Sequence, residues 1–196
     1  LSHLKCKYYK RIDMKKDTRE ILLDAAVIVF SKNPGAPISE VADFAGVGRA
    51  TLYRHFPSRD DLIRELILES YQQMNDALTP VLAQNLSGTD LFLSILEATI
   101  PLGDRYYFLM LERTFEEDPE IQALYQKDAH DWVELFENLK AEGVLAPEVP
   151  TAWAVSAVEA LIYSAWSSVH EGYIARRDAH HLVYRTLLSG LGPKDN

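Results

Sequence analysis

The sequence predicts an all-α protein with a small N-terminal helical domain and a larger helical C-terminal domain. Apolar residues recur at helical spacing along most of the chain, and no stretch shows the sustained alternation of a half-buried β-strand. Proline and glycine interrupt this pattern at intervals, and the dipeptides typical of tight hairpins are absent. The 196 residues, 47% of them hydrophobic, allow one large domain or a small and a medium one.

Nine helices are expected. They span residues 17–31, 38–45, 49–56, 59–78, 89–100, 104–116, 119–141, 151–172 and 176–190. Asp17 and Ser58 stand where a short polar side chain can cap the first and fourth helices. Pro80 is expected to lie in the loop after the fourth helix, since proline cannot continue a helix without losing a hydrogen bond.

The charge is distributed unevenly along the chain. The net charge is −9, but residues 1–60 hold 11 lysines and arginines against seven acidic residues, a net charge of +4. The remaining 136 residues carry a net charge of −13. A positive head on an acidic body suggests that only the head meets a polyanion, and the alternative is chance clustering.

The first residues and the domain boundaries form a second expectation. MKKDTRE reads as a native start, so residues 1–13 are interpreted as an artefact upstream of Met14, with a basic arm as the alternative. The expected domains then span residues 14–63 and 64–196. The single cysteine, Cys6, has no metal-ligand spacing around it, and neither a signal peptide nor a membrane span is visible. A cytoplasmic protein without membrane, metal or cofactor is expected.

Residues 37–56 fit a helix-turn-helix. Ala42 allows two helices to cross closely, and Gly46 permits the positive φ that the turn needs. The apolar residues expected to lock the two helices together are Val41, Ala45, Val47 and Leu52.

The second helix of this motif then presents polar and small residues to its surroundings. They are Arg49, Ala50, Thr51, Tyr53, Arg54 and His55. Arg49 can make a bidentate contact with guanine, whereas the side chains of Thr51, Tyr53 and His55 suit phosphate oxygens. Arg59, beside the backbone amides of the next helix, is expected to form a second phosphate clamp. The alternative is a helical hairpin with a solvated basic face.

The same stretch resembles a known family. Ala25-Ala26 and Phe30, followed by ISEVADFAGVGRATLYRHFPSRDDLI, are similar to the DNA-binding domain of the tetracycline-repressor (TetR) family of bacterial regulators. The resemblance covers about residues 17–65. It implies a three-helix DNA-binding head, a fourth linking helix, and a helical C-terminal domain for ligand binding and dimerisation.

Two positions depart from the family pattern. Many members have threonine near the start of the second helix, where this chain has Pro37-Ile38-Ser39, so Ser39 is expected to take over a phosphate contact. Many have a serine at the position of Gly48, which would cap the recognition helix. Glycine caps a helix more weakly, so the entrance to this helix is expected to be looser.

Aromatic residues are dense in the C-terminal half and suggest a ligand pocket between helices. The candidate pocket residues are Phe92, Tyr107, Phe108, Glu112, Trp132, Trp153, Tyr163 and Trp166. The alternative is that these aromatics form ordinary core. If glutamates face the pocket, a lipophilic cation would be attracted by charge and by cation–π contacts.

The last two helices are expected to form the interface of a homodimer. The first of them is rich in small residues that allow close helix approach, and a dimer would place two such helices from each subunit in a four-helix interface. The alternative is that they only close the core of the monomer.

The predicted function is that of a repressor released from a palindromic double-stranded DNA operator by a small apolar or aromatic effector. An enzyme is not expected, since no phosphate loop, nucleophile motif or zinc motif occurs, and Asp128, His130 and Asp131 lie too close in sequence to converge. The remaining alternative is an all-helical small-molecule-binding protein whose DNA-binding head is not functional.

Overall fold

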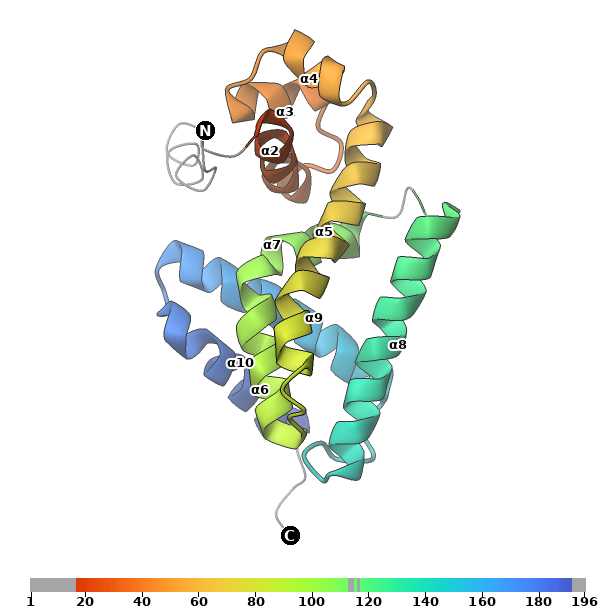
Figure 1. Cartoon of the computed structure of the whole chain (residues 1–196). Helices are drawn as coiled ribbons and strands as arrows, with labels where there is room; N and C mark the ends of the chain where they lie inside the picture. Colours follow the sequence, from red (N-terminus) through yellow and green to blue (C-terminus); the bar gives the residue numbers. More distant parts are fainter. Residues whose placement is uncertain (1–16, 113–114, 116, 192–196) are drawn as a thin grey trace. The chain divides into compact units, whose positions relative to one another are not determined.

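The computed structural model describes residues 17–112, 115 and 117–191, and these residues form helices and no strand. Contacts divide them into two compact units. The first holds residues 17–70 and 108–112, and the second holds residues 71–107, 115 and 117–191. The prediction of an all-α protein is confirmed (Figure 1). Residues 1–13, interpreted above as an artefact or a basic arm, lie outside the described residues.

The first unit is built around a buried helix. Its helices are α2 (Thr18–Lys32), α3 (Ile38–Ala45), α4 (Arg49–His55) and the first half of α5 (Arg59–Leu82). Asp17 caps α2 as expected, because its Oδ1 accepts a hydrogen bond of 2.9 Å from the Glu20 N–H. Between Ile21 and Phe30 every residue of α2 except Asp24 is buried. Such complete burial makes α2 the central element on which α3 packs.

Ser58 caps α5, also as expected. The Asp61 N–H donates to Ser58 Oγ over 3.1 Å, and the Ser58 N–H donates to Asp61 Oδ2 over 3.0 Å. These reciprocal bonds form a capping box, which satisfies backbone donors that the first turn of a helix leaves unpaired. The start of α5 is therefore sharply defined.

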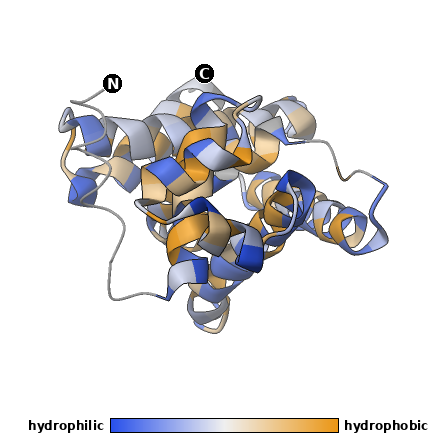
Figure 2. Ribbon diagram, turned by 90° about the horizontal axis from the view of Figure 1, so that it is seen from above, coloured by the Kyte–Doolittle hydropathy of each residue, from blue (hydrophilic) through white to orange (hydrophobic). Residues whose placement is uncertain are grey.

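The second unit is a helical bundle around an aromatic core. After the end of α5 it contains α6 (Gly88–Thr99), η1 (Ile100–Leu102), the start of α7 (Gly103–Leu111), α8 (Pro119–Ala141), α9 (Thr151–Glu171) and α10 (Arg176–Leu191). Helix α10 packs against α9 and α6, and α8 packs against the same two helices. Hydrophobic and hydrophilic residues share each helix, as surface helices around a core require (Figure 2). None of the described helices has the length and apolarity needed to cross a membrane.

Two helices end more than two residues from the expected position. Helix α5 continues through Pro80 to Leu82, whereas a loop was predicted at that proline. The missing N–H costs only one bond so close to the helix end, and Thr79 Oγ1 donates to the Asn75 carbonyl over 2.7 Å in the same turn. Helix α7 ends at Leu111 and not at residue 116.

Gly103 brings α7 against α9. A Cβ atom at this position would lie 2.4 Å from Trp166 Cβ and 3.0 Å from the Ile162 carbonyl oxygen. Real Cβ atoms do not approach other atoms so closely, so only glycine fits at this contact. The expected break between α6 and α7 at Pro101 and Gly103 is a single 3₁₀ turn.

Candidate nucleic-acid interface and ligand cavity

The turn between α3 and α4 has the geometry that the sequence predicts. Gly46 has φ of 70°, in the left-handed region, and the Val47 N–H donates to the Ala42 carbonyl over 3.0 Å. Ala42 and Leu52 are fully buried, whereas Val47 is only half-buried. The two short helices are therefore fixed against each other by a small residue, a glycine turn and one leucine.

Helix α4 turns most of its predicted contact residues outward. Arg49, Ala50 and Tyr53 are exposed, and Thr51 and His55 are half-buried. The Tyr53 side chain, 48% exposed, is one of the large hydrophobic residues left open to solvent. The structure thus gathers five predicted contact residues on one seven-residue helix, preceded by the exposed Gly48.

Two further groups accompany this face. Ser39, the second residue of α3, is half-buried near the start of that helix, where the N-cap Pro37 offers no side-chain hydrogen bond. Arg49 Nη2 lies 3.5 Å from Asp43 Oδ2, and both side chains are more than half exposed. Such an exposed pair contributes little to stability, so Arg49 is available to a stronger partner.

Gly48 stands at the N-cap of α4 without a side-chain cap. Its φ and ψ of −65° and 141° are accessible to any residue, and a Cβ atom there would meet nothing within 4 Å. A serine would therefore fit at this position. Steric hindrance therefore does not explain why this chain lacks the capping serine that is typical of the family.

Arg59 has partners inside the first unit that the sequence did not reveal. Its Nε donates to the Ala36 carbonyl over 3.3 Å, and Nη2 donates to the Pro34 carbonyl. The guanidinium carbon lies 4.8 Å from the centroid of the Phe30 ring, within the range of a cation–π contact. Arg59 thus ties the loop after α2 to the start of α5, and its expected contact with phosphate stays a prediction.

The second unit contains a cavity of about 370 Å³ between the end of α5, α6 and α8. Its lining residues are Leu78, Leu82, Leu91, Ile95, Lys127, Asp128, Asp131, Trp132, Glu134, Leu135 and Asn138. Of the eight predicted pocket residues, only Trp132 is among them. This volume lies within the range of small-molecule sites.

The α8 side of the cavity is acidic. Burial and the nearby carboxylates of Glu159 and Asp131 together raise the pKa of Asp128 to about 7, against the lowering effect of Lys127. Lys127 Nζ lies 2.6 Å from Asp131 Oδ2, so that lysine already has an anionic partner. The cavity wall therefore holds more negative charge than its single lysine balances.

Most of the predicted pocket aromatics pack on one another. Tyr107 stacks on Tyr163 with ring centroids 4.0 Å apart, and Tyr163 stacks on Trp166 at 5.7 Å. In a second cluster, Phe136 lies 5.8 Å from Phe92 and 6.0 Å from Trp132. These ring contacts fill space between helices and favour the core interpretation for Phe92, Tyr163 and Trp166, whose place in a ligand pocket stays a prediction.

The other predicted pocket residues also lie away from the cavity. Phe108 is buried and groups with the first unit, as does the half-buried Glu112 just after the end of α7. Trp153, on α9, is 61% exposed. The roles of these three residues in a ligand pocket stay predictions.

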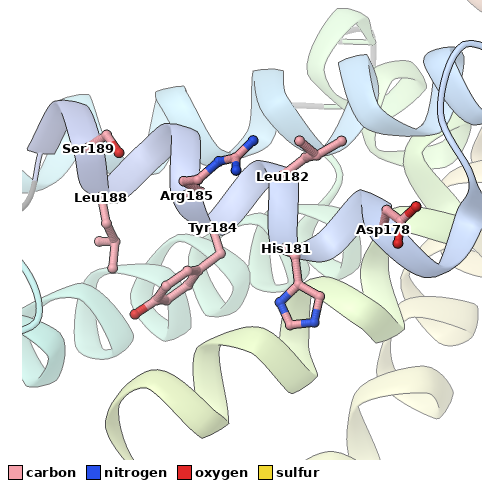
Figure 3. A pocket seen from close by; sticks show the side chains of 7 residues that line it. All are labelled: Asp178, His181, Leu182, Tyr184, Arg185, Leu188 and Ser189. Atoms are coloured by element: carbon pink, nitrogen blue, oxygen red, sulfur yellow. The ribbon is translucent and has the colours of Figure 1, made fainter.

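A second hollow, of about 680 Å³, lies along α10 alone. Figure 3 shows that its seven lining residues all come from this helix, with His181, Tyr184 and Leu188 pointing to one side. A hollow with one helix as its wall is an open face and not an enclosed pocket.

Small residues on α9 suggested that this helix approaches a partner closely. Two of them, Ala154 and Ala165, are already buried in the subunit.

The sequence carried a signal for the cavity that went unused. Asp128, Trp132 and Leu135 repeat at spacings of four and three residues, which places them on one face of α8. From the sequence, Asp128 and Asp131 were considered only as catalytic groups. That role was excluded because residues so close along a helix do not point toward one another. The partners on α5 and α6 are apolar residues, which the sequence cannot distinguish from core.

Comparison with known proteins decides the family. The model of the bacterial regulatory proteins of the TetR family matches residues 22–66. The HTH-type transcriptional repressor LfrR of Mycolicibacterium smegmatis is 30% identical over 179 residues, which cover 90% of this chain and 92% of the relative. This chain belongs to the TetR family.

Solved TetR-like structures agree with this assignment. LfrR from Mycobacterium smegmatis in complex with proflavine has a TM-score of 0.68 at 26% identity, covering 90% of this chain and 97% of that one. The ketosteroid regulator KstR2 of Mycobacterium tuberculosis, at 17% identity, has a TM-score of 0.69 and covers 91% and 97%. At 17% identity, the similarity to KstR2 shows a shared fold only.

Membership of the TetR family makes this chain a DNA-binding transcriptional regulator and not an enzyme. The predicted fold, a helix-turn-helix head followed by a helical C-terminal part, is confirmed. The individual contacts of Arg49, Thr51, Tyr53 and His55 with DNA stay predictions.

Proposed function

We propose that this chain is a cytoplasmic repressor that binds a palindromic operator as a homodimer and leaves it when a small apolar or aromatic effector binds. The observation that carries the proposal is the outward face of α4, where Arg49, Ala50 and Tyr53 are exposed above a fully buried Leu52. A short helix held in this way can enter the major groove with its N-terminal residues toward the bases.

Effector control is supported by the second unit. Its cavity has the volume of a small-molecule site, and the relative LfrR is a repressor that has been solved with proflavine. Helix α5 begins at Arg59 in the head and contributes Leu78 and Leu82 to the cavity. A ligand that binds one position of this helix better than another would shift the head between states, by no more than that difference in affinity.

A dimer is supported by the open face of α10. Among the described residues, the hollow that holds His181, Arg185 and Leu188 is lined by α10 alone, so the same face of a partner can complete it. A twofold dimer presents two recognition helices in inverted orientation. The operator should accordingly read as a near-palindrome.

The proposal is tested by selecting bound duplexes from a random DNA library at near-physiological salt, with Arg49→Ala in parallel. The wild type is expected to enrich one palindrome. Arg49→Ala should lose about 1–3 kcal/mol of binding free energy and blur the preference at one base pair of each half-site, because a bidentate guanine contact is removed.

Two results would count against this reading. If Arg49→Ala keeps the full base preference, Arg49 contacts only phosphate. If the wild type enriches no sequence and its DNA affinity does not fall with rising salt, the head does not read DNA, since phosphate contacts release counterions on binding. The chain would then be a small-molecule-binding protein with an inactive head.

A further inference from the structure

We propose that the cavity between α5, α6 and α8 takes an amphipathic organic cation, whose positive group is held by Asp128 and whose apolar body lies against Trp132 and the leucines. The inference rests on the proposed effector control and names the class of the effector. It concerns one cavity that lies entirely within the second unit.

The cavity has one apolar wall and one charged wall. From α5 and α6 it is lined only by Leu78, Leu82, Leu91 and Ile95, so that wall offers apolar surface and no charge. From α8 come three carboxylates, one lysine, one amide, Leu135 and the Trp132 ring. A ligand that satisfies both walls has an apolar body and a positive group at one side.

Charge favours a cation over a neutral or anionic ligand. The lining holds Asp128, Asp131 and Glu134 against Lys127, and Lys127 is already paired with Asp131. Glu159 adds a further carboxylate close enough to act on Asp128 from α9. An anion would be repelled by these four carboxylates, whereas a cation would reduce the repulsion among them.

Trp132 adds a second recognition element. It is 5% exposed and stacks on Phe136, which fixes the orientation of its ring. Only a small part of the indole is therefore open to the cavity, where it offers apolar contact and a cation–π partner for a positive group. A planar aromatic cation would use both properties.

Binding of a cation should depend on pH. Asp128 must be ionised to hold a positive group, and burial together with Glu159 and Asp131 opposes that ionisation, with Lys127 favouring it. The pKa of Asp128 is raised to about 7, so affinity for a permanent cation should increase between pH 6 and pH 8. The bound cation would in turn lower that pKa and release a proton.

The test is a fluorescence titration of proflavine against the full chain in the absence of DNA. Proflavine is a planar aromatic amine that stays protonated between pH 6 and pH 8, so its own charge does not change across the range. Asp128→Asn should weaken binding at pH 8 by roughly ten- to a hundredfold, the effect of removing one charged partner, and should abolish the rise in affinity with pH.

Matched variants isolate the site. Glu120→Gln removes the same charge from the exposed start of α8, outside the cavity, and should leave the affinity within about twofold. Leu82 is 59% exposed, so Leu82→Arg should fold and should weaken binding by placing a fixed positive charge at the cavity, whereas Leu82→Gln should have a smaller effect. These two changes on α5 test the cavity even if Asp128→Asn proves unstable.

Equal affinity of the wild type and Asp128→Asn overturns the inference, as does failure of the wild type to bind proflavine. Loss of affinity in both Asp128→Asn and Leu82→Arg supports it. Because no DNA is present, failure of the operator selection leaves the titration valid. Conversely, a regulator that binds its palindrome but no cation would retain the proposed function and lose only this site.

Discussion

Asp128 carries a carboxylate whose ionisation opposes folding. Its pKa is raised from 3.8 to about 7 in the folded chain, mainly by burial. An acid with a raised folded-state pKa favours the folded state below its unfolded pKa and loses that contribution as pH rises towards the folded value. A carboxylate at this position therefore costs stability, as is common where a charge serves binding.

Asp128→Asn should raise the melting temperature at pH 8 and raise it less at pH 5. At pH 8 the substitution removes an ionised, poorly solvated carboxylate, whereas at pH 5 that carboxylate is already protonated in the folded chain. Thermal melts of both proteins at the two pH values measure the difference. An equal gain at both values would mean that the substitution acts through packing and not through charge.

Gly48→Ser should stabilise the head. The hydroxyl can cap α4, and replacing glycine also reduces the freedom of the unfolded chain, which together contribute about 0.5–1 kcal/mol. Gly48→Ala is the matched control, because it gains the entropic part and lacks the cap. Chemical denaturation that ranks alanine at or above serine would exclude a capping role.

At the level of single residues, the sequence predicted backbone roles better than side-chain partners. Gly46, Asp17 and Ser58 act as expected because a turn or cap needs only local geometry. Arg59 was assigned to phosphate, yet its guanidinium reaches the Pro34 and Ala36 carbonyls, more than 20 positions away. Partners so distant in sequence leave no local pattern to read.

The helices themselves follow from apolar spacing and from their terminal residues. Helix α8 has the predicted bounds, since Asp118 caps it and Pro119 occupies its first turn. The predicted loop at Pro80 was wrong, because one lost hydrogen bond near a helix end costs little and α5 continues to Leu82. The order of the helices was thus predictable, whereas their exact ends depended on which terminal interactions form.

The contact between α7 and α9 depends on the absence of a side chain at Gly103. Gly103→Ala should destabilise the chain by about 1–3 kcal/mol, because its Cβ would overlap Trp166 unless the backbone shifts. Gly190→Ala is the matched control on α10, where nothing lies within 4 Å and alanine should favour the helix. Urea denaturation should give changes of opposite sign, and equal signs would contradict the close approach.

For the whole molecule, the distribution of charge and the open face of α10 define two different surfaces. Residues 1–60 carry a net charge of +4, which comes from residues 1–16, where six lysines and arginines stand against one acidic residue, and the acidic remainder repels DNA. The cavity could not be predicted at this scale, because Leu82, Leu91 and Asp128 meet only once three helices have packed. Aromatic residues, used as the sequence marker of a pocket, mostly fill the core.

Leu188→Asp should convert the proposed dimer into monomers. Leu188 lines the open hollow on α10, and a buried unpaired charge at an interface opposes association. Thr186→Asp adds the same charge at an exposed position outside that hollow and should leave the assembly unchanged.

Sedimentation of both variants measures their assembly. Operator affinity should also fall roughly a hundredfold or more with Leu188→Asp, because the second half-site no longer contributes to binding. Persistence of a dimer would place the interface elsewhere.

The arrangement of the cavity bears on how such regulators diverge after gene duplication. Its four charged lining residues all lie between Lys127 and Glu134, in two turns of one helix, and none belongs to the head. Substitutions confined to those two turns could invert the charge preference for the proposed effector while the DNA-binding residues stayed the same. A duplicated copy would thereby acquire a new chemical signal for an old set of genes.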